Sequence, residues 1–159
     1  LGSTCLHNLQ VGDDVTFTGA YGEFELDLSA DTELICVGGG CGMAPMRSIL
    51  RHVHEVSPNQ KCRLFFGART MDDLMYFEDF RGLAKGMDRF GVHYALSEPG
   101  QSPDWDGETG FIHEAVEHHL GTEGRRQAFL CGPPQMVEAT MRVLQAKGLT
   151  HDRIFYDEF

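Results

Sequence analysis

Short apolar runs alternate with longer segments of helical periodicity along most of this 159-residue sequence. The short runs are rich in aromatic and β-branched residues, and the longer segments repeat apolar residues at every third or fourth position, as in Val137, Met141 and Leu144. The runs predict five strands, at residues 33–38, 63–67, 92–96, 128–131 and 153–156. Helices are expected to begin near Ala44, Asp72, Phe111 and Pro134. This alternation predicts a doubly wound α/β domain with a five-stranded parallel sheet.

The first 30 residues follow a different pattern. The segments VTFTG and GEFELDL alternate apolar and polar residues with a period of two, on either side of a Gly-Ala-Tyr-Gly turn at residues 19–22. Antiparallel strands are therefore expected here. Because two strands cannot bury themselves alone, we predict that residues 1–30 are the trailing strands of a second, incomplete domain and that residues 31–159 form the α/β domain.

The charge balance and the cysteine content narrow the choice of partners and location. With 24 acidic against 13 basic side chains, the formal net charge is −11, and such a surface repels nucleic acids. No apolar stretch approaches the roughly 20 residues that span a bilayer, so no direct membrane insertion is expected. The N-terminus shows no signal peptide pattern, and the five cysteines include no closely spaced pairs. We therefore expect reduced thiols and a cytoplasmic location.

The spacing of the histidines gives no support to metal chemistry. His52 and His54 would point to opposite sides of a helix, and the adjacent His118 and His119 cannot converge on one ion. The sequence also lacks the Gly-x-Ser-x-Gly motif of many hydrolases. We therefore predict surface histidines and no metal site.

The segment LICVGGGCGMAPMRSIL, residues 34–50, joins a predicted strand to a predicted helix through consecutive glycines. Bare backbone N–H groups at a helix N-terminus let a diphosphate approach without obstruction from a Cβ atom. The usual dinucleotide fingerprint is absent, because Pro45 stands where its last glycine is needed and residues 57–70 contain no acidic side chain. Taken alone, the turn fits either a phosphate cradle or a tight connection without a ligand.

A second turn that contains glycine and proline follows a later strand, in FLCGPPQMV at residues 129–137. In a parallel sheet the two turns would face each other across the carboxyl edge and form a crevice. Cys131 would lie at that edge near a helix N-terminus, which lowers the pKa of a thiol. Its position fits a nucleophile, a packing residue or a cofactor contact.

The chain resembles the NADH-binding domain of ferredoxin–NADP reductase-like flavoproteins in six motifs that occur in the family's order: GGGCGMAPMRS, FFGARTMDDLMYFEDF, ALSEP, TGFIHEAV, LCGPPQMV and the terminal IFYDEF. Within this family it most resembles the F subunit of the sodium-translocating NADH:quinone reductases, followed by the reductase components of multicomponent oxygenases. The resemblance spans essentially the whole chain. It implies that residues 1–30 close a FAD-binding barrel, with Ser3 and Thr4 near the FAD diphosphate.

The resemblance also implies roles for the two turns. The first would hold the NADH diphosphate with Gly39, Gly40, Cys41, Gly42, Met43, Ala44 and Pro45. The second would flank the nicotinamide with Cys131, Gly132, Pro133 and Met136. Phe159 resembles the aromatic residue that covers the flavin ring, although it could also be an ordinary aromatic residue closing the last strand. Cys131 and Phe159 are thus the candidate catalytic residues, at the place where hydride would pass to the flavin.

Two features of the family are missing from this sequence, the Arg-x-Tyr-Ser/Thr flavin motif and the four-cysteine 2Fe–2S motif. We therefore expect a C-terminal portion of a longer reductase, whose upstream ferredoxin-like and FAD domains carry the 2Fe–2S cluster and most of the FAD site. Electrons would pass from NADH to FAD and onward to an iron–sulfur centre and a quinone or an oxygenase. Other subunits of a membrane reductase complex are candidate partners. The alternative is a nucleotide-binding regulatory module without electron transfer.

The residue after the third strand bears on the choice of nucleotide. NADPH-specific relatives place an arginine directly after the serine that ends this strand, whereas here Ser97 precedes Glu98. A carboxylate there would repel the 2′-phosphate of NADPH and accept hydrogen bonds from the ribose hydroxyls of NADH. Arg69 at the end of the second strand could partly cancel that repulsion, and Glu98 could instead be a solvated turn residue. We expect a preference for NADH.

Overall fold

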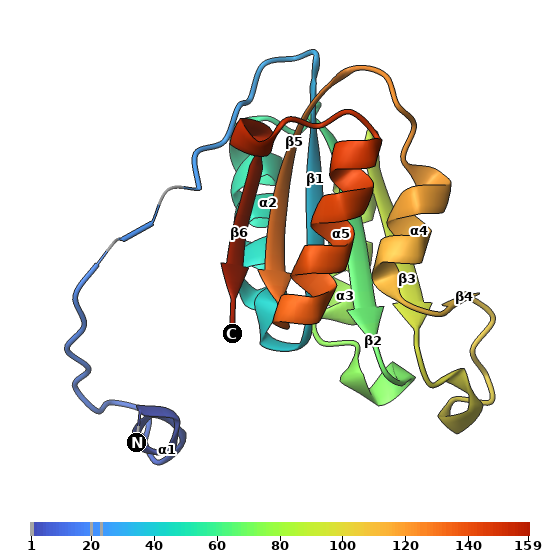
Figure 1. Ribbon diagram of the computed structural model, residues 1–159. Helices are drawn as coiled ribbons and strands as arrows, with labels where there is room; N and C mark the ends of the chain where they lie inside the picture. Colours follow the sequence, from blue (N-terminus) through green and yellow to red (C-terminus); the bar gives the residue numbers. More distant parts are fainter. Residues whose placement is uncertain (1, 20, 23) are drawn as a thin grey trace.

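The computed structural model describes residues 2–19, 21–22 and 24–159, and its centre is one parallel β-sheet. The strands lie in the order β4-β3-β2-β1-β5-β6 (Figure 1). Their bounds are β1 (Thr32–Gly39), β2 (Lys61–Ala68), β3 (Phe90–Leu96), β4 (Glu108–Thr109), β5 (Arg125–Gly132) and β6 (Ile154–Glu158). All five predicted strands are present, and neighbouring strands are parallel. The sequence did not predict β4, because a strand of two residues shows no periodicity.

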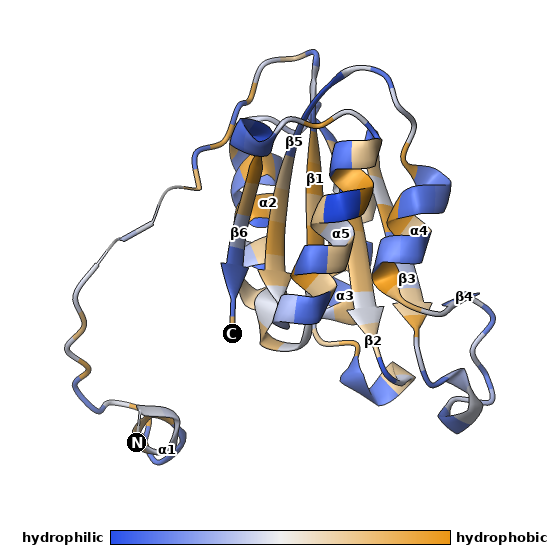
Figure 2. Cartoon of the chain, viewed as in Figure 1, coloured by the Kyte–Doolittle hydropathy of each residue, from blue (hydrophilic) through white to orange (hydrophobic). Residues whose placement is uncertain are grey.

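Helices cover both faces of the sheet, which confirms the doubly wound fold (Figure 1). On one face lie α2 (Met43–Val56) and α3 (Phe77–Gly86), and on the other lie α4 (Ile112–His119) and α5 (Pro134–Ala146). Each turns an apolar side to the strands, as shown by the fully buried Leu50 of α2 and Leu144 of α5. Figure 2 shows apolar strands between helices whose outer faces are polar. Among the described residues, no helix has both the length and the apolar character needed to cross a lipid bilayer.

The start of α3 differs from the prediction. A helix was expected to begin near Asp72, but residues Met71–Asp73 form a single 3₁₀ turn and α3 begins at Phe77. The carboxylate of Asp73 accepts a hydrogen bond from the N–H of Thr70 at 3.0 Å and closes this turn. Tyr76, with φ of 59°, then adopts the left-handed conformation, which interrupts helical geometry. These local features delay the helix.

The strand order reverses next to β1. From β1 the chain continues through β2 and β3 to β4 on one side, and it then returns to β5 and β6 on the other side. All eight residues of β1 are buried, as expected for a central strand of a sheet that is covered on both faces. Ligands of open α/β sheets bind at the carboxyl edge beside such a reversal. A site is therefore expected at this edge.

The part of the chain that precedes β1 differs from the prediction. α1 (Gly2–His7) is a short exposed helix, and the chain that follows it runs extended and apart from the sheet for much of its length (Figure 1). The strands predicted at residues 15–19 and 22–28 do not form among the described residues, and Ala20 of the predicted turn and Glu23 lie outside them. Phe24, Leu26 and Leu28 of the second segment nevertheless pack against the core, so its alternation marks a buried face without strand pairing. The assignment of residues 1–30 to a FAD-binding barrel stays a prediction.

Asp27 fixes the end of this segment to the sheet. Its Oδ2 accepts hydrogen bonds from Nη2 of Arg125 and Nη2 of Arg153, both at 2.8 Å. Its Oδ1 accepts one from the hydroxyl of Ser29 at 2.5 Å, and its backbone N–H donates to Oε1 of Gln127 at 2.8 Å. The hydrogen bonds from Ser29 and then Arg153 hold the pKa of Asp27 well below its usual range. Asp27 therefore stays charged and joins this segment to β5 and to the 3₁₀ turn, His151–Arg153, that precedes β6.

Candidate functional site

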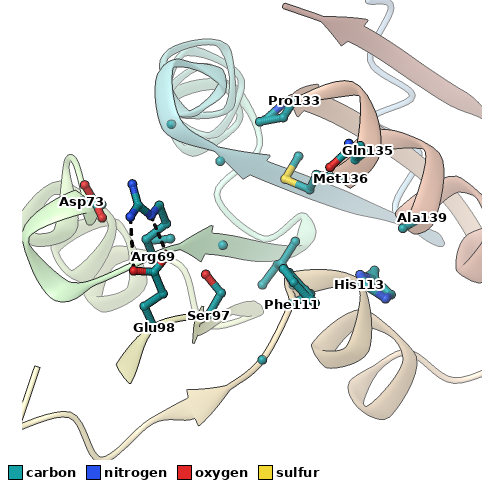
Figure 3. A pocket seen from close by; sticks show the side chains of 16 residues that line it. Arg69, Asp73, Ser97, Glu98, Phe111, His113, Pro133, Gln135, Met136 and Ala139 are labelled. Atoms are coloured by element: carbon teal, nitrogen blue, oxygen red, sulfur yellow. Dashed lines mark hydrogen bonds and ion pairs between the residues drawn. The ribbon is translucent and has the colours of Figure 1, made fainter. Parts of the chain in front are cut away.

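A cleft of about 740 Å³ opens at the carboxyl edge of the sheet, beside the reversal of strand order. Its walls come from the ends of β1, β2 and β3, the segment that enters α4, and the first turns of α5 (Figure 3). The lining residues that the sequence predicted are Gly39, Gly40, Arg69, Ser97, Glu98, Pro133 and Met136. The fold thus brings the turns after β1 and β5 together with the ends of β2 and β3. The sequence predicted that these two turns would form a crevice at this edge.

Gly39 and Gly40 give the cleft a surface of bare backbone at the end of β1. A Cβ atom on Gly39 would lie 3.1 Å from both the carbonyl oxygen of Gly67 and the sulfur of Met136, which is tighter than ordinary contact. Gly40 has φ of 55°, in the left-handed region that favours glycine. The N-cap of α2 is Gly42, which has no side chain to accept hydrogen bonds from the first N–H groups of the helix. The N–H of Met43 already donates to the carbonyl oxygens of Gly40 and Cys41, so only the other N–H groups of this turn are left to donate to an anion.

Gly42 and Met43 serve packing rather than the cleft surface. A Cβ atom on Gly42 would lie 2.0 Å from the carbonyl oxygen of Cys131, so α2 meets the end of β5 backbone to backbone. Met43 is fully buried in the core, where no ligand in the cleft can reach its side chain. The predicted residues of this turn that do not line the cleft are Cys41, Gly42, Met43, Ala44 and Pro45.

The turn after β5 supplies the opposite wall. Pro133 and Met136 line the cleft, and a Cβ atom on Gly132 would lie 2.6 Å from the terminal methyl of Met136. Cys131 is only 4% exposed and belongs to the core behind the wall. Burial, and then the charge of Asp157, raises the pKa of the Cys131 thiol, whereas its place near a helix N-terminus had predicted a lower value. A neutral, buried thiol is a poor nucleophile, so the role of a packing residue or a cofactor contact fits Cys131 better than that of a nucleophile.

The side of the cleft formed by β2 and β3 is polar. Arg69 donates to Glu98 from Nε to Oε1 at 2.8 Å and from Nη2 to Oε2 at 3.2 Å (Figure 3). The amide of Gln101 donates to Oε2 of Glu98 at 2.7 Å. The hydrogen bond from Arg69 is the main reason why the pKa of Glu98 is lowered. Ser97 and Asp73 line the same side. A ligand here therefore meets the Glu98 carboxylate and the Arg69 guanidinium as a pair.

Sequence reasoning missed the wall at the start of α4. Phe111, Ile112 and His113 line the cleft, and Phe111 is 63% exposed (Figure 3). Gly110, with φ of 111°, makes the turn by which the chain enters the helix. The sequence signal that could have pointed to the wall is an aromatic residue between a glycine and a predicted helix, as in Gly110-Phe111. Ala139 of α5 also lines the cleft, and its sequence context gives no such signal.

The remaining candidates lie outside the cleft. Phe159 is 59% exposed beyond the end of β6, and its N–H donates to the carbonyl oxygen of Gly132 at 3.4 Å. It therefore lies at the same carboxyl edge, next to the turn after β5. Ser3 and Thr4 belong to α1, which Figure 1 shows away from the sheet. Their contact with a FAD diphosphate stays a prediction.

A doubly wound α/β domain with bare glycine backbone in a cleft at its strand reversal defines a dinucleotide-binding domain. Every cleft-lining residue named above falls within residues 36–142, the range matched by a model of one protein family. The chain belongs to that family, the oxidoreductase NAD-binding domains.

Curated relatives with similar sequences carry the names of reductases. The chain is 39% identical over 155 residues to the reductase component of propane 2-monooxygenase from Mycolicibacterium goodii, a match that covers 96% of this chain and 44% of the relative. It is 38% identical over 162 residues to the F subunit of the Na⁺-translocating NADH-quinone reductase from Mannheimia succiniciproducens, covering 99% of this chain and 39% of the relative. The chain thus spans less than half the length of these relatives.

Solved structures share the fold. The cytochrome b5 reductase domain of Ulva prolifera nitrate reductase superposes with a TM-score of 0.86 at 26% identity, over 99% of this chain and 65% of that one. An Amycolatopsis cytochrome P450 reductase superposes with a TM-score of 0.82 at 31% identity, over 96% of this chain and 46% of that one. These matches confirm the fold class and the resemblance to reductases of the ferredoxin–NADP reductase type.

Proposed function

We propose that this chain is the NADH-binding domain of a flavin-dependent reductase, and that the whole protein passes hydride from NADH to FAD and electrons onward to an iron–sulfur centre and a quinone or oxygenase acceptor. The observation that carries the proposal is the cleft, where bare glycine backbone lies opposite the apolar start of α4. A dinucleotide needs both surfaces, one for its diphosphate and one for its rings. The names of the relatives support a reductase.

Each wall of the cleft has its own part in the proposed binding. Gly39 and Gly40 would take the diphosphate, because they offer N–H groups and no obstructing Cβ atoms. Pro133 and Met136 would flank the nicotinamide, and Phe159 at the same edge would cover the flavin. FAD supplies the hydride acceptor when it is bound, while this chain orients the nucleotide. An exposed aromatic ring at the carboxyl edge fits that arrangement.

A bulky side chain in the cleft tests the proposed site. Ala139→Trp places an indole on the α5 wall and should weaken NADH binding by about tenfold or more, because the ring occupies space that the nucleotide needs. The matched control is Gln145→Trp, which adds the same ring to an exposed position near the end of α5. Isothermal titration calorimetry measures both. Equal losses in the two variants, or no loss in Ala139→Trp, would contradict the assignment of the cleft.

The Arg69–Glu98 pair is proposed to select NADH over NADPH. Glu98 can accept hydrogen bonds from ribose hydroxyls, whereas a 2′-phosphate would have to compete with this carboxylate for Arg69. Glu98→Arg replaces the carboxylate by a second guanidinium and should raise the ratio of NADPH to NADH affinity by about tenfold or more.

Titrations of both nucleotides at fixed ionic strength measure this ratio. Glu98→Gln, which removes the charge but adds no cation, is the control and should give a smaller change in the same direction. Equal affinities for the two nucleotides in the unaltered chain, or no gain for NADPH in Glu98→Arg, would show that selectivity lies elsewhere.

We infer that the partners of this chain are upstream FAD and ferredoxin-like domains of the same protein, together with other subunits of a membrane reductase complex on its cytoplasmic side. All five cysteines are free thiols, which supports a reducing compartment. The upstream coding sequence tests the inference. It should contain the Arg-x-Tyr-Ser/Thr flavin motif and the four-cysteine 2Fe–2S motif, and the absence of both would contradict it.

A further inference from the structure

Three side chains that ligate metals elsewhere meet at the β4 edge of the sheet, on the face that α4 covers. His93 lies on β3, Glu108 on β4 and His119 at the end of α4. Ala95 of β3 is opposite Glu108, and His93 stands two residues before Ala95, so the side chains of His93 and Glu108 lie on the same face. α4 packs across this face and brings His119 to the pair.

The donor atoms of these residues face one another. Oε1 of Glu108 lies 3.1 Å from Nε2 of His119 and 3.8 Å from Nδ1 of His93, and the three atoms are all within 4.8 Å of one another. Ligand atoms on a tetrahedral zinc ion, with bonds of about 2.0–2.1 Å, are about 3.3–3.4 Å apart. His119 is 39% exposed, so its ring can rotate to close the remaining difference.

Neighbouring side chains hold the cluster in place. The ring of Phe65 stacks on His93 with centroids 4.9 Å apart, and His93 stacks on His119 at 4.1 Å. The indole N–H of Trp105 donates to the carbonyl oxygen of Glu108 at 2.9 Å and so anchors β4. This contact gives a structural role to Trp105, whose loop carries no other assigned function. His93 and Glu108 are therefore ordered before any ion binds, and the more exposed His119 adjusts to complete the site.

The charges around the cluster also suit a cation. Arg63 donates to the carbonyl oxygen of His119, and its guanidinium is paired at 2.6 Å with Glu33, which offsets part of its positive charge and is shared with Lys61. An imidazole nitrogen that carries no proton has a lone pair to offer to a metal ion. Glu108 contributes a negative charge.

We propose that His93, Glu108 and His119 bind a divalent transition metal ion of the zinc class, with water or an external ligand in the fourth position. Two imidazole nitrogens and a carboxylate oxygen are a donor set that zinc accepts, whereas calcium and magnesium take oxygen ligands. The sequence analysis predicted no metal site, because spacing along the chain shows only whether histidines that are close in sequence can bind one ion. Here the fold joins residues from three separate elements.

The site has a structural consequence for the cleft. An ion would tie β4 to β3 and to the end of α4, and the segment between β4 and α4 contains Gly110 and Phe111, which line the cleft. Because the ion binds only the folded arrangement, it should raise the melting temperature of the chain.

Zinc titration tests the proposal in a Cys5→Ser, Cys41→Ser background, which removes the exposed thiols that also bind zinc. Calorimetry should show one ion per chain with a dissociation constant in the micromolar range. His119→Ala should weaken binding by about tenfold or more. His118→Ala, which changes the exposed neighbour on the same helix, is the matched control and should bind as the parent does.

Histidine-ring NMR of the parent chain gives a readout that does not depend on how the variants fold. Zinc should shift the ring resonances of His93 and His119 and leave those of His118 unchanged. The proposal is overturned if no saturable binding occurs below about 1 mM zinc, if His119→Ala binds as tightly as the parent, or if only other histidines respond.

Discussion

Replacing Gly42 by alanine is expected to lower the free energy of unfolding by about 3–4 kcal/mol and to weaken NADH binding by about tenfold or more. The added methyl group would lie 2.0 Å from the carbonyl oxygen of Cys131, and backbone atoms at the end of a central strand cannot move aside as a flexible side chain can. α2 must therefore shift away from β5. That shift also moves Gly40, two residues before Gly42, which lines the cleft at the proposed diphosphate position.

Urea denaturation and NADH titration of the same variant measure both effects. The control is Gly40→Ala in the same turn, where a Cβ atom has nothing within 4 Å. Its φ of 55° makes alanine strained, so a smaller loss of about 1–2 kcal/mol is expected. If the two variants lose equal stability, the close approach of α2 to β5 is not what requires glycine at position 42.

Replacing Asp27 by asparagine is expected to lower the free energy of unfolding by about 2–3 kcal/mol near neutral pH. The substitution removes the charge that accepts hydrogen bonds from Ser29, Arg125 and Arg153. Arg125 is 53% exposed and can turn to water, so most of the loss should come from the contacts with Ser29 and Arg153. Asp31→Asn, at an exposed position next to β1, is the control and should change stability little.

The effect of Asp27→Asn should depend on pH in one direction. The folded chain lowers the pKa of this carboxyl, so its stabilising contribution is complete above the unfolded value and is lost as pH falls toward the folded value. The difference between parent and variant should be constant from about pH 5 to pH 7 and should shrink below about pH 4. Urea denaturation across this range measures it. A difference that grows as pH falls would contradict the role assigned to Asp27.

The central strands could be predicted from sequence because both of their faces are buried. β1 and most of β5 are runs of buried residues, which a parallel sheet requires. β4 could not be found, since its two residues are placed by pairing with β3 and by the hydrogen bond from Trp105. The prediction of strands in the N-terminal segment was wrong for a related reason. In the second segment the alternation marks Phe24, Leu26 and Leu28, which pack against the core, but a strand also needs a neighbouring strand to pair with, and the described residues provide none here.

The residues of the candidate site could be predicted where their role depends on the local conformation of the backbone. Gly39, Gly40 and Pro133 belong to turns whose composition alone indicates bare backbone at a sheet edge, and all three line the cleft. Gly42 and Cys131 belong to the same two turns and were also predicted to contact the nucleotide. In the structure they pack α2 against the end of β5 instead. The difference depends on a tertiary contact, which spacing along the chain does not reveal. The meeting of His93 with His119 has the same origin.

Titration of the ¹⁵N-labelled chain with NADH, followed by amide chemical shifts, tests the proposed nucleotide site most directly. We expect saturable shifts at micromolar to millimolar NADH, concentrated at Gly39 and Gly40, at Glu98, and at Met136, because these residues from three walls surround one cleft. Ala139→Trp should suppress the shifts while Gln145→Trp leaves them intact. No saturable shift at millimolar NADH, or shifts confined to residues outside the cleft, would contradict the assignment of this cleft to NADH.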